Sequence, residues 1–202
     1  MTEKGKKRPF YWEQFSPAPA AQDGSEHKES KLPPGADLAS MRRGIGRDPG
    51  SMPAMWPLYT QLKNDGRLTR ELWAEHNALS LFGVHQQGES FLVHRPGFFF
   101  GAAVRQLRDD GRHSDTAVDR RFAAAATAND VTEVAHHLRG LVNLLKTLTP
   151  TQGFDYTELF NDLCAWQNPK RRGDVRRRWG AAYYTNQLFT TSPTDTTGNT
   201  LS

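Results

Sequence analysis

Cysteine is almost missing from this chain, since Cys164 is the only one in 202 residues. A single cysteine cannot form an internal disulfide or a Cys-rich zinc site, so nothing points to a secreted, disulfide-stabilised domain. No apolar run approaches the roughly 18 residues that a transmembrane helix needs. The first residues, MTEKGKKRPF, also lack the apolar stretch of a signal peptide. We therefore expect a cytoplasmic protein with no membrane partner.

Recognisable catalytic and metal-binding motifs are absent as well. None of the seven histidines falls in an HExxH motif, and the neighbours His136 and His137 would point about 100° apart on a helix. His76 lies on an apolar stripe, which favours a hydrogen-bonded core histidine over a metal ligand. The segment GIGRDPG (44–50) lacks the preceding strand and the following Lys-Ser/Thr of a phosphate-binding loop, so it is interpreted as an ordinary loop. The sequence predicts a protein that is not an enzyme and uses no cofactor or metal.

The alternation of apolar and polar residues that marks β-strands is nearly absent, whereas apolar residues recur at steps of three and four. The clearest stripe runs from Val131 to Leu148, behind an N-cap candidate at Asp130 and ahead of Pro150. Similar stripes predict other helices, which start after Ser51 with a kink or delay at Pro57, after Asp65 or Thr69, near Phe100, after Ser114, near Tyr156, and from Gly173 to about Gln187. We predict an all-α fold, a single helical bundle with short connections.

Composition divides the chain into three regions. The first, 1–35, holds a charged tail, an aromatic cluster at 10–15 that can dock as one helical turn, and a Pro-, Ala- and Ser-rich linker at 16–35. The helical patterns fill 36–189, and the remaining residues, 190–202, are too polar to pack. We predict one folded domain with disordered N- and C-terminal tails. On the helical stripes we assign Trp56, Trp166 and Trp179 to its core.

Arginine, in contrast, is abundant and clustered. The segment PKRRGDVRRRW (169–179) contains six cations and one acid, while many of the other acids lie in tails, linker and turns. The net charge of +4 is therefore uneven, and we expect this cluster to stay unneutralised. If Gly173 breaks the helix, Arg172 and Arg176 can still align one turn apart. Guanidinium groups suit phosphate oxygens, although ion pairs within the chain are the alternative for any single pair.

Six segments, in this order over residues 36–184, carry a family resemblance: ADLASMRRG, MPAMWPLY, FFFGAAVRQL, VDRRF, AHHLRGLVNLL and FNDLCAWQNPKRRGDVRRRWGAAYY. The series resembles the CasB small subunit of the type I-E CRISPR Cascade complex. This resemblance implies an α-helical subunit without an active site, present as a second copy in the complex beside other Cascade subunits, both backbone and large. It also implies contact with the crRNA, the target DNA and the displaced non-target strand.

The resemblance assigns individual positions. The basic pairs 42–43 and 120–121 match two basic pairs of the family, Arg139 matches a basic position in the long helix, and 170–172 match the turn after the aromatic helix. Because 122–138 contains no Lys or Arg, whereas family members can carry them there, contacts at that point are expected either to be lost or to move to Arg105 and Arg108. The long helix also carries a polar stripe opposite its leucines, formed by His136, Arg139, Asn143 and Lys146, which suits a phosphate chain. Together with the C-terminal cluster, this gives the predicted nucleic-acid contacts: Arg42, Arg43, Arg105, Arg108, Arg120, Arg121, Arg139, Lys146, Lys170, Arg171, Arg172, Arg176 and Arg177.

The resulting hypothesis is a strip of cations that compensates phosphate repulsion as the DNA opens and so stabilises the R-loop, while base pairing elsewhere reads the sequence. One alternative is an assembly subunit whose arginines meet acidic patches on neighbouring proteins. Another is a stand-alone helical DNA-binding regulator, which would need a recognition helix with polar, base-reading side chains. A third is an unrecognised hydrolase.

Overall fold

The computed structural model describes residues 8–15 and 31–185 of the chain. In that part the regular structure is helical, without strands, and an isolated parallel bridge joins His94 to Phe154. The elements are η1 (Tyr11–Phe15), α1 (Gly35–Arg43), η2 (Pro53–Leu58), α2 (Arg70–Gln86), α3 (Phe100–Asp109), α4 (Asp115–Thr127), α5 (Val131–Leu145), α6 (Tyr156–Trp166) and α7 (Pro169–Tyr184), where η marks a 3₁₀ helix. The predicted all-α bundle is confirmed. The predicted tails lie mostly outside the described residues.

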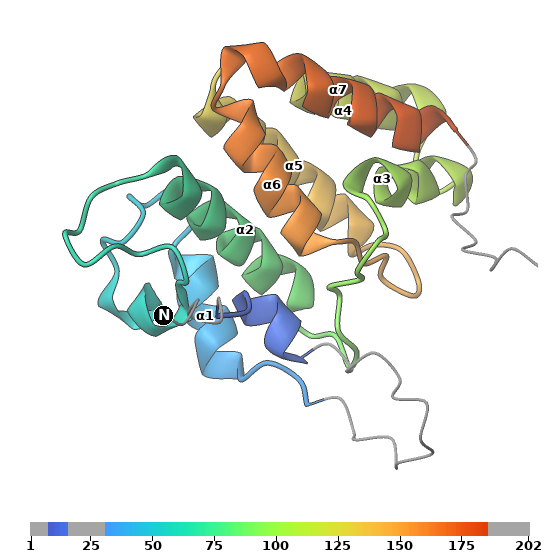
Figure 1. Cartoon of the computed structure of the whole chain (residues 1–202). Helices are drawn as coiled ribbons and strands as arrows, with labels where there is room; N and C mark the ends of the chain where they lie inside the picture. The colour runs from blue at the N-terminus through green and yellow to red at the C-terminus, as the bar shows by residue number, and fades with distance from the viewer. Residues whose placement is uncertain (1–7, 16–30, 186–202) are drawn as a thin grey trace, which may run out of the picture.

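The helices form two ends joined by a central pair (Figure 1). One end consists of η1, α1, η2 and α2, the other of α3, α4 and α7, and α5 and α6 lie between them and contact α2. No helix in the described part of the chain is both long and apolar enough to span a bilayer.

Several helix starts follow the N-cap residues expected from the sequence. The Thr69 side chain accepts a hydrogen bond from the Leu72 amide, and Asp130 accepts from the amides of Thr132 and Glu133. Ser114 caps α4 in the same way. These bonds satisfy amide groups that have no partner inside the helix, which is why short polar residues mark the starts.

Two helix predictions are wrong. The stripe after Ser51 gives only the 3₁₀ helix η2, because Pro57, inside the segment, lacks the amide hydrogen that an α-helix would use there. Gly173 does not break a helix: α7 begins at Pro169, with Asn168 as its N-cap, and runs through Gly173 to Tyr184. The expected end at about Gln187 lies outside the described residues.

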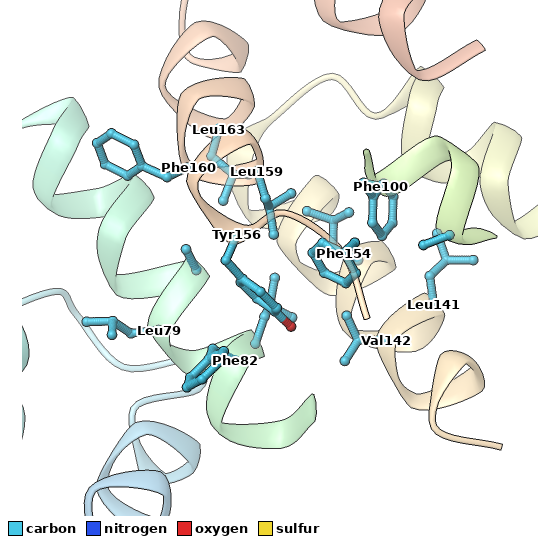
Figure 2. Close-up of a cluster of buried hydrophobic side chains, with 14 of the residues drawn as sticks. Leu79, Phe82, Phe100, Leu141, Val142, Phe154, Tyr156, Leu159, Phe160 and Leu163 are labelled. Atoms are coloured by element: carbon cyan, nitrogen blue, oxygen red, sulfur yellow. The ribbon is translucent and has the colours of Figure 1, made fainter. Parts of the chain in front are cut away.

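The core fills the space between α2, α3, α5 and α6 (Figure 2). Tyr156 lies at its centre, with its ring stacked on Phe154 at 4.4 Å between centroids and edge-on to Phe82 at 5.2 Å. Each fully buried side chain of this size stabilises the fold by about 1.5–3 kcal/mol. The labelled side chains are Leu79, Phe82, Phe100, Leu141, Val142, Phe154, Tyr156, Leu159, Phe160 and Leu163.

The tryptophan assignments have mixed outcomes. Trp166 and Trp179 are buried and stack on each other at 5.2 Å, as predicted. The assignment of Trp56 to the core is wrong, because its side chain is 51% exposed and its indole N–H donates to the Gly50 carbonyl. In the short helix η2, a helical stripe does not predict which side faces inward.

The aromatic turn near the N-terminus docks on the bundle as the 3₁₀ helix η1. Trp12 is fully buried, and its indole N–H donates to the Thr157 hydroxyl oxygen at 2.9 Å. That hydroxyl donates in turn to the Glu13 carboxylate at 2.7 Å. The expected helical turn at 10–15 is confirmed, and it packs on the start of α6.

Candidate nucleic-acid interface

The predicted cations of α3 already have carboxylate partners within the chain. Arg105 pairs with Asp109 one turn later, with 2.7 Å between Nε and Oδ1. Arg108 pairs with Asp115 at 3.2 Å and with Asp119 at 3.4 Å, both on α4. These ion pairs tie α3 to its own last turn and to α4, which leaves Arg105 and Arg108 with little unneutralised charge.

Lys146, the last member of the polar stripe on α5, is occupied at the end of α2. Its ammonium group donates to the carbonyls of Val84, His85 and Gln87, at 2.9, 3.2 and 2.5 Å. These carbonyls belong to the last turn of α2 and to its C-cap Gln87, where a helix leaves acceptors unsatisfied and favours a cation. Glu89 lies 3.9 Å away. Lys146 therefore holds α2 against α5.

The C-terminal cluster divides into engaged and free cations. Arg172 and Arg176 both lie over the buried Trp166 ring, with Cζ 6.0 and 5.5 Å from its centroid, so their expected alignment on one face is confirmed. Arg176 also donates to the carbonyls of Thr127 and Ala128 at the end of α4. Lys170 and Arg171, at the start of α7, are exposed.

The expectation that this cluster has no acidic partners is wrong for two of its arginines. Arg177 forms an ion pair with Asp174, and Arg178 forms one with Asp162. Asp162 also accepts the Trp179 indole N–H at 2.5 Å. Burial raises the pKa of the Asp162 carboxyl, and the bonds from Trp179 and Arg178 oppose that shift. Asp162 comes from α6, so its role could not be seen from the α7 segment alone.

Several predicted cations have, among the described residues, neither a carboxylate partner nor a side-chain bond to a backbone carbonyl. They come from different elements: the last turn of α1, the middle of α4, the exposed face of α5 and the start of α7. These unpaired cations are Arg42, Arg43, Arg120, Arg121, Arg139, Lys170 and Arg171. Of this set, Arg43 donates to the Ser40 hydroxyl oxygen at 3.3 Å. In the described part of the chain, these predicted cations keep a positive charge that no carboxylate pairs with.

A cleft brings one of these cations together with its neighbour on the polar stripe of α5 and with Arg47, which the sequence did not single out. It has a volume of about 470 Å³ and is lined by the loop after α1, by α2 and by α5. Arg139 lines it with His136, and Arg47 enters from the loop. Arg47 has no carboxylate partner in the described residues either. The segment 44–50 was correctly interpreted as a loop, but its position opposite α5 depends on how α1 and α5 pack on α2.

The end of α1 contributes a further charge near the C-terminal end of α5. Burial lowers the pKa of Lys146, Glu89 opposes that shift, and the charge of Arg42 contributes to it. Arg42 therefore lies within electrostatic reach of the end of α5. Cations of α1, of the loop that follows it and of α5 thus gather around α2.

The buried histidines have structural roles in the core. His76 is buried between the Tyr59 hydroxyl and the Gly44 carbonyl, at 2.7 and 2.9 Å, so the predicted core histidine is confirmed. Burial lowers the pKa of His85 to about 3, and the Lys146 charge adds to the shift. In the described part of the chain, no three His, Cys, Asp or Glu side chains gather where they could hold a metal ion.

In its described part, this chain is an all-helical protein, and some of its surface cations have no carboxylate partner. Its fold matches the crystal structure of CasB from Thermobifida fusca with a TM-score of 0.60 and 26% identity, over 75% of this chain and 85% of that one. CasB from Thermus thermophilus matches with a TM-score of 0.57 and 27% identity, over 74% and 85%. CasB from M. ruber matches with 0.57 and 26%, over 77% and 86%. No curated protein sequence matches the chain.

The family model of the CRISPR-associated protein Cse2 matches residues 37–184. The chain therefore belongs to the Cse2 family of CRISPR-associated proteins, and the three solved structures named above are of CasB proteins. This confirms the family that the ordered segments of the sequence indicate.

Proposed function

We propose that this chain is the non-catalytic small subunit of a type I-E Cascade complex, where it holds nucleic-acid backbone and prolongs the life of the R-loop. Its partners are the crRNA, the target DNA with its displaced strand, other Cascade subunits and a second copy of the chain. The observation that carries the proposal is the contrast between paired and unpaired cations. Arg105, Arg108 and Arg177 meet carboxylates of the chain, whereas the unpaired cations of α1, α4, α5 and α7 do not.

Unpaired exposed cations favour a polyanion, because each phosphate contact releases counterions that were condensed on the nucleic acid. Such contacts need no base-reading side chains, in agreement with a complex in which guide pairing reads the sequence. The proposed interface therefore consists of the unpaired cations. It omits Arg105, Arg108, Lys146, Arg172, Arg176 and Arg177 from the contacts expected from sequence, because each already has a partner in the chain.

The test is the lifetime of the R-loop in a reconstituted complex. The variant Lys170→Ala with Arg171→Ala removes two unpaired cations, and we expect roughly tenfold faster collapse if the two contacts together contribute about 1.4 kcal/mol. The matched control is Arg177→Ala on the same helix, which removes a cation that Asp174 already neutralises. Equal lifetimes for the wild type, the double variant and the control would contradict the proposal.

The rival function is an assembly subunit whose cations bind acidic patches of neighbouring proteins. Native mass spectrometry of the same complexes separates the two functions. If the double variant collapses faster while the small subunit keeps full occupancy, nucleic-acid contact is supported. If occupancy falls in parallel with lifetime, the cations act in assembly.

A further inference from the structure

The cleft between α2, α5 and the loop after α1 has the size of a binding site for one small group. Its volume of about 470 Å³ falls within the roughly 300–1,000 Å³ typical of sites for small ligands and cofactors. Residues from three separate elements line it, among them Arg47, Trp73, Ser80 and Arg139. A nucleic-acid duplex could not enter such a space, whereas a single nucleotide could.

The charge of the cleft favours an anionic group. Arg47 and Arg139 approach it from the loop and from α5, and neither forms an ion pair within the described residues. His136 lines the same side as Arg139, three residues earlier on α5. Asp48 is the one acid among the lining residues, and it is exposed. A phosphate group placed between the two guanidinium groups would receive hydrogen bonds from separate elements.

On the α2 side of the cleft, Asn77 offers a polar atom. Asn77 donates its amide N–H to the Trp73 carbonyl, so its side-chain oxygen is left as an acceptor among the described residues. Ser80 also lines the cleft, but its hydroxyl is buried close to Gly44 and is not open to a ligand. The polar edge of a ligand would therefore donate to the Asn77 amide oxygen.

The same cleft also presents an aromatic and apolar wall. Trp73 is half-buried and lines it, and the Leu68 side chain, 60% exposed, lies at the same end of α2. Every nucleobase has a flat face that can stack on such a ring. An acidic peptide would neutralise the arginines but would make no use of an indole face beside the Asn77 amide. The combination therefore favours a nucleotide over a peptide.

We propose that this cleft takes up one unstacked nucleotide of a single strand, with its base against Trp73, its polar edge toward Asn77 and its phosphate at Arg47 and Arg139. The inference rests on the proposed function, because it assigns to the nucleic-acid surface a place where a base, and not only the backbone, is bound. It predicts a preference for strands that carry bases over strands of equal charge that lack them.

The experiment compares the full chain binding a short labelled oligothymidylate and an abasic strand of the same length, measured by fluorescence anisotropy. The wild type is expected to bind the base-carrying strand about tenfold more tightly, which is within the range for one stacked base. Trp73→Leu should remove that preference without changing the affinity for the abasic strand. Trp73→Phe should restore most of it.

The matched control is Trp56→Leu, because Trp56 is exposed and lies outside the cleft. It should keep the full preference, and Arg47→Ala should weaken binding of both strands. Equal affinity of the wild type for both strands overturns the cleft assignment but leaves the proposed function standing. Absence of salt-dependent binding to either strand counts against the proposed function itself. Displacement of the strand by oligoglutamate that depends on Trp73 would overturn the assignment in favour of an acidic peptide.

Discussion

Arg139 and Lys146 share the polar stripe of α5, yet their surroundings give them different roles. Lys146 donates to three carbonyls at the end of α2, while Arg139 faces the cleft with no ion-pair partner in the described residues. We expect Lys146→Ala to lower the free energy of unfolding by about 2 kcal/mol, since it leaves helix-terminal acceptors without their charged donor. Arg139→Ala should change stability by less than about 0.5 kcal/mol. Urea denaturation of both variants measures this, and equal losses would contradict the assignment.

The buried His85 makes stability depend on pH. Burial depresses its pKa in the folded state to about 3, below the usual value of 6.5, so the unfolded state binds the proton more readily. Its contribution to stability is therefore complete above pH 6.5 and is lost as the pH falls toward 3. Buried Glu75 and Asp162 act in the opposite sense, because burial raises the pKa of each carboxyl.

We predict that His85→Gln, which keeps an acceptor for the Tyr156 hydroxyl, loses less thermal stability between pH 7 and pH 5 than the wild type does. Each pH unit can cost the wild type at most about 1.4 kcal/mol at this residue. Melting temperatures across that pH range provide the measurement. Parallel curves for the two proteins would show that His85 does not carry the dependence.

At the residue scale, the sequence predicts which residues are charged but not which charges are neutralised. Arg178 and Asp162 are 16 positions apart and meet only because α6 and α7 pack together. Arg47 could not be assigned for the same reason, since the cleft that contains it forms only when the loop and α5 meet across α2. His76 could be assigned because its apolar stripe alone indicates burial.

Among the elements, α3 and α7 approach each other closely at Gly101. A Cβ atom added there would lie 2.4 Å from the Trp179 carbonyl oxygen, and a backbone atom cannot move aside cheaply. We expect Gly101→Ala to destabilise the protein by about 1–3 kcal/mol through overpacking. Gly180→Ala, on α7, has no atom within 4 Å of the added Cβ and should stabilise by about 0.5–1 kcal/mol. Chemical denaturation checks both, and a shift of the same sign in both variants would contradict this packing.

Element boundaries were predictable where local chemistry sets them. Thr69, Ser114 and Asp130 cap their helices through side-chain bonds to nearby amides, a signal contained in a few residues. The start of α7 has an equally local signal, Asn168 followed by Pro169, whereas the prediction began this helix at Gly173. Helix packing outweighs the low helix propensity of one glycine, because Val175 and Trp179 bury the face that follows it.

For the whole molecule, the fold class and the family could be inferred from sequence, because helical periodicity and the order of segments extend over most of the chain. The distribution of free charge could not, because it depends on contacts between elements far apart in sequence. After the described residues have folded, the cations of α1, α4, α5 and α7 that lack a carboxylate partner are still available to bind a nucleic acid.

The salt dependence of binding to single-stranded DNA tests this account most directly. If about six phosphates are neutralised, log affinity should fall against log salt with a slope near −4. Lys170→Ala with Arg171→Ala should make that slope shallower by about 1.4, at about 0.7 for each contact. Arg105→Ala with Arg177→Ala lowers the net charge equally but removes cations already paired with Asp109 and Asp174, so its slope should stay near −4. Equal slopes for the two double variants would contradict the claim that the unpaired cations hold the nucleic acid.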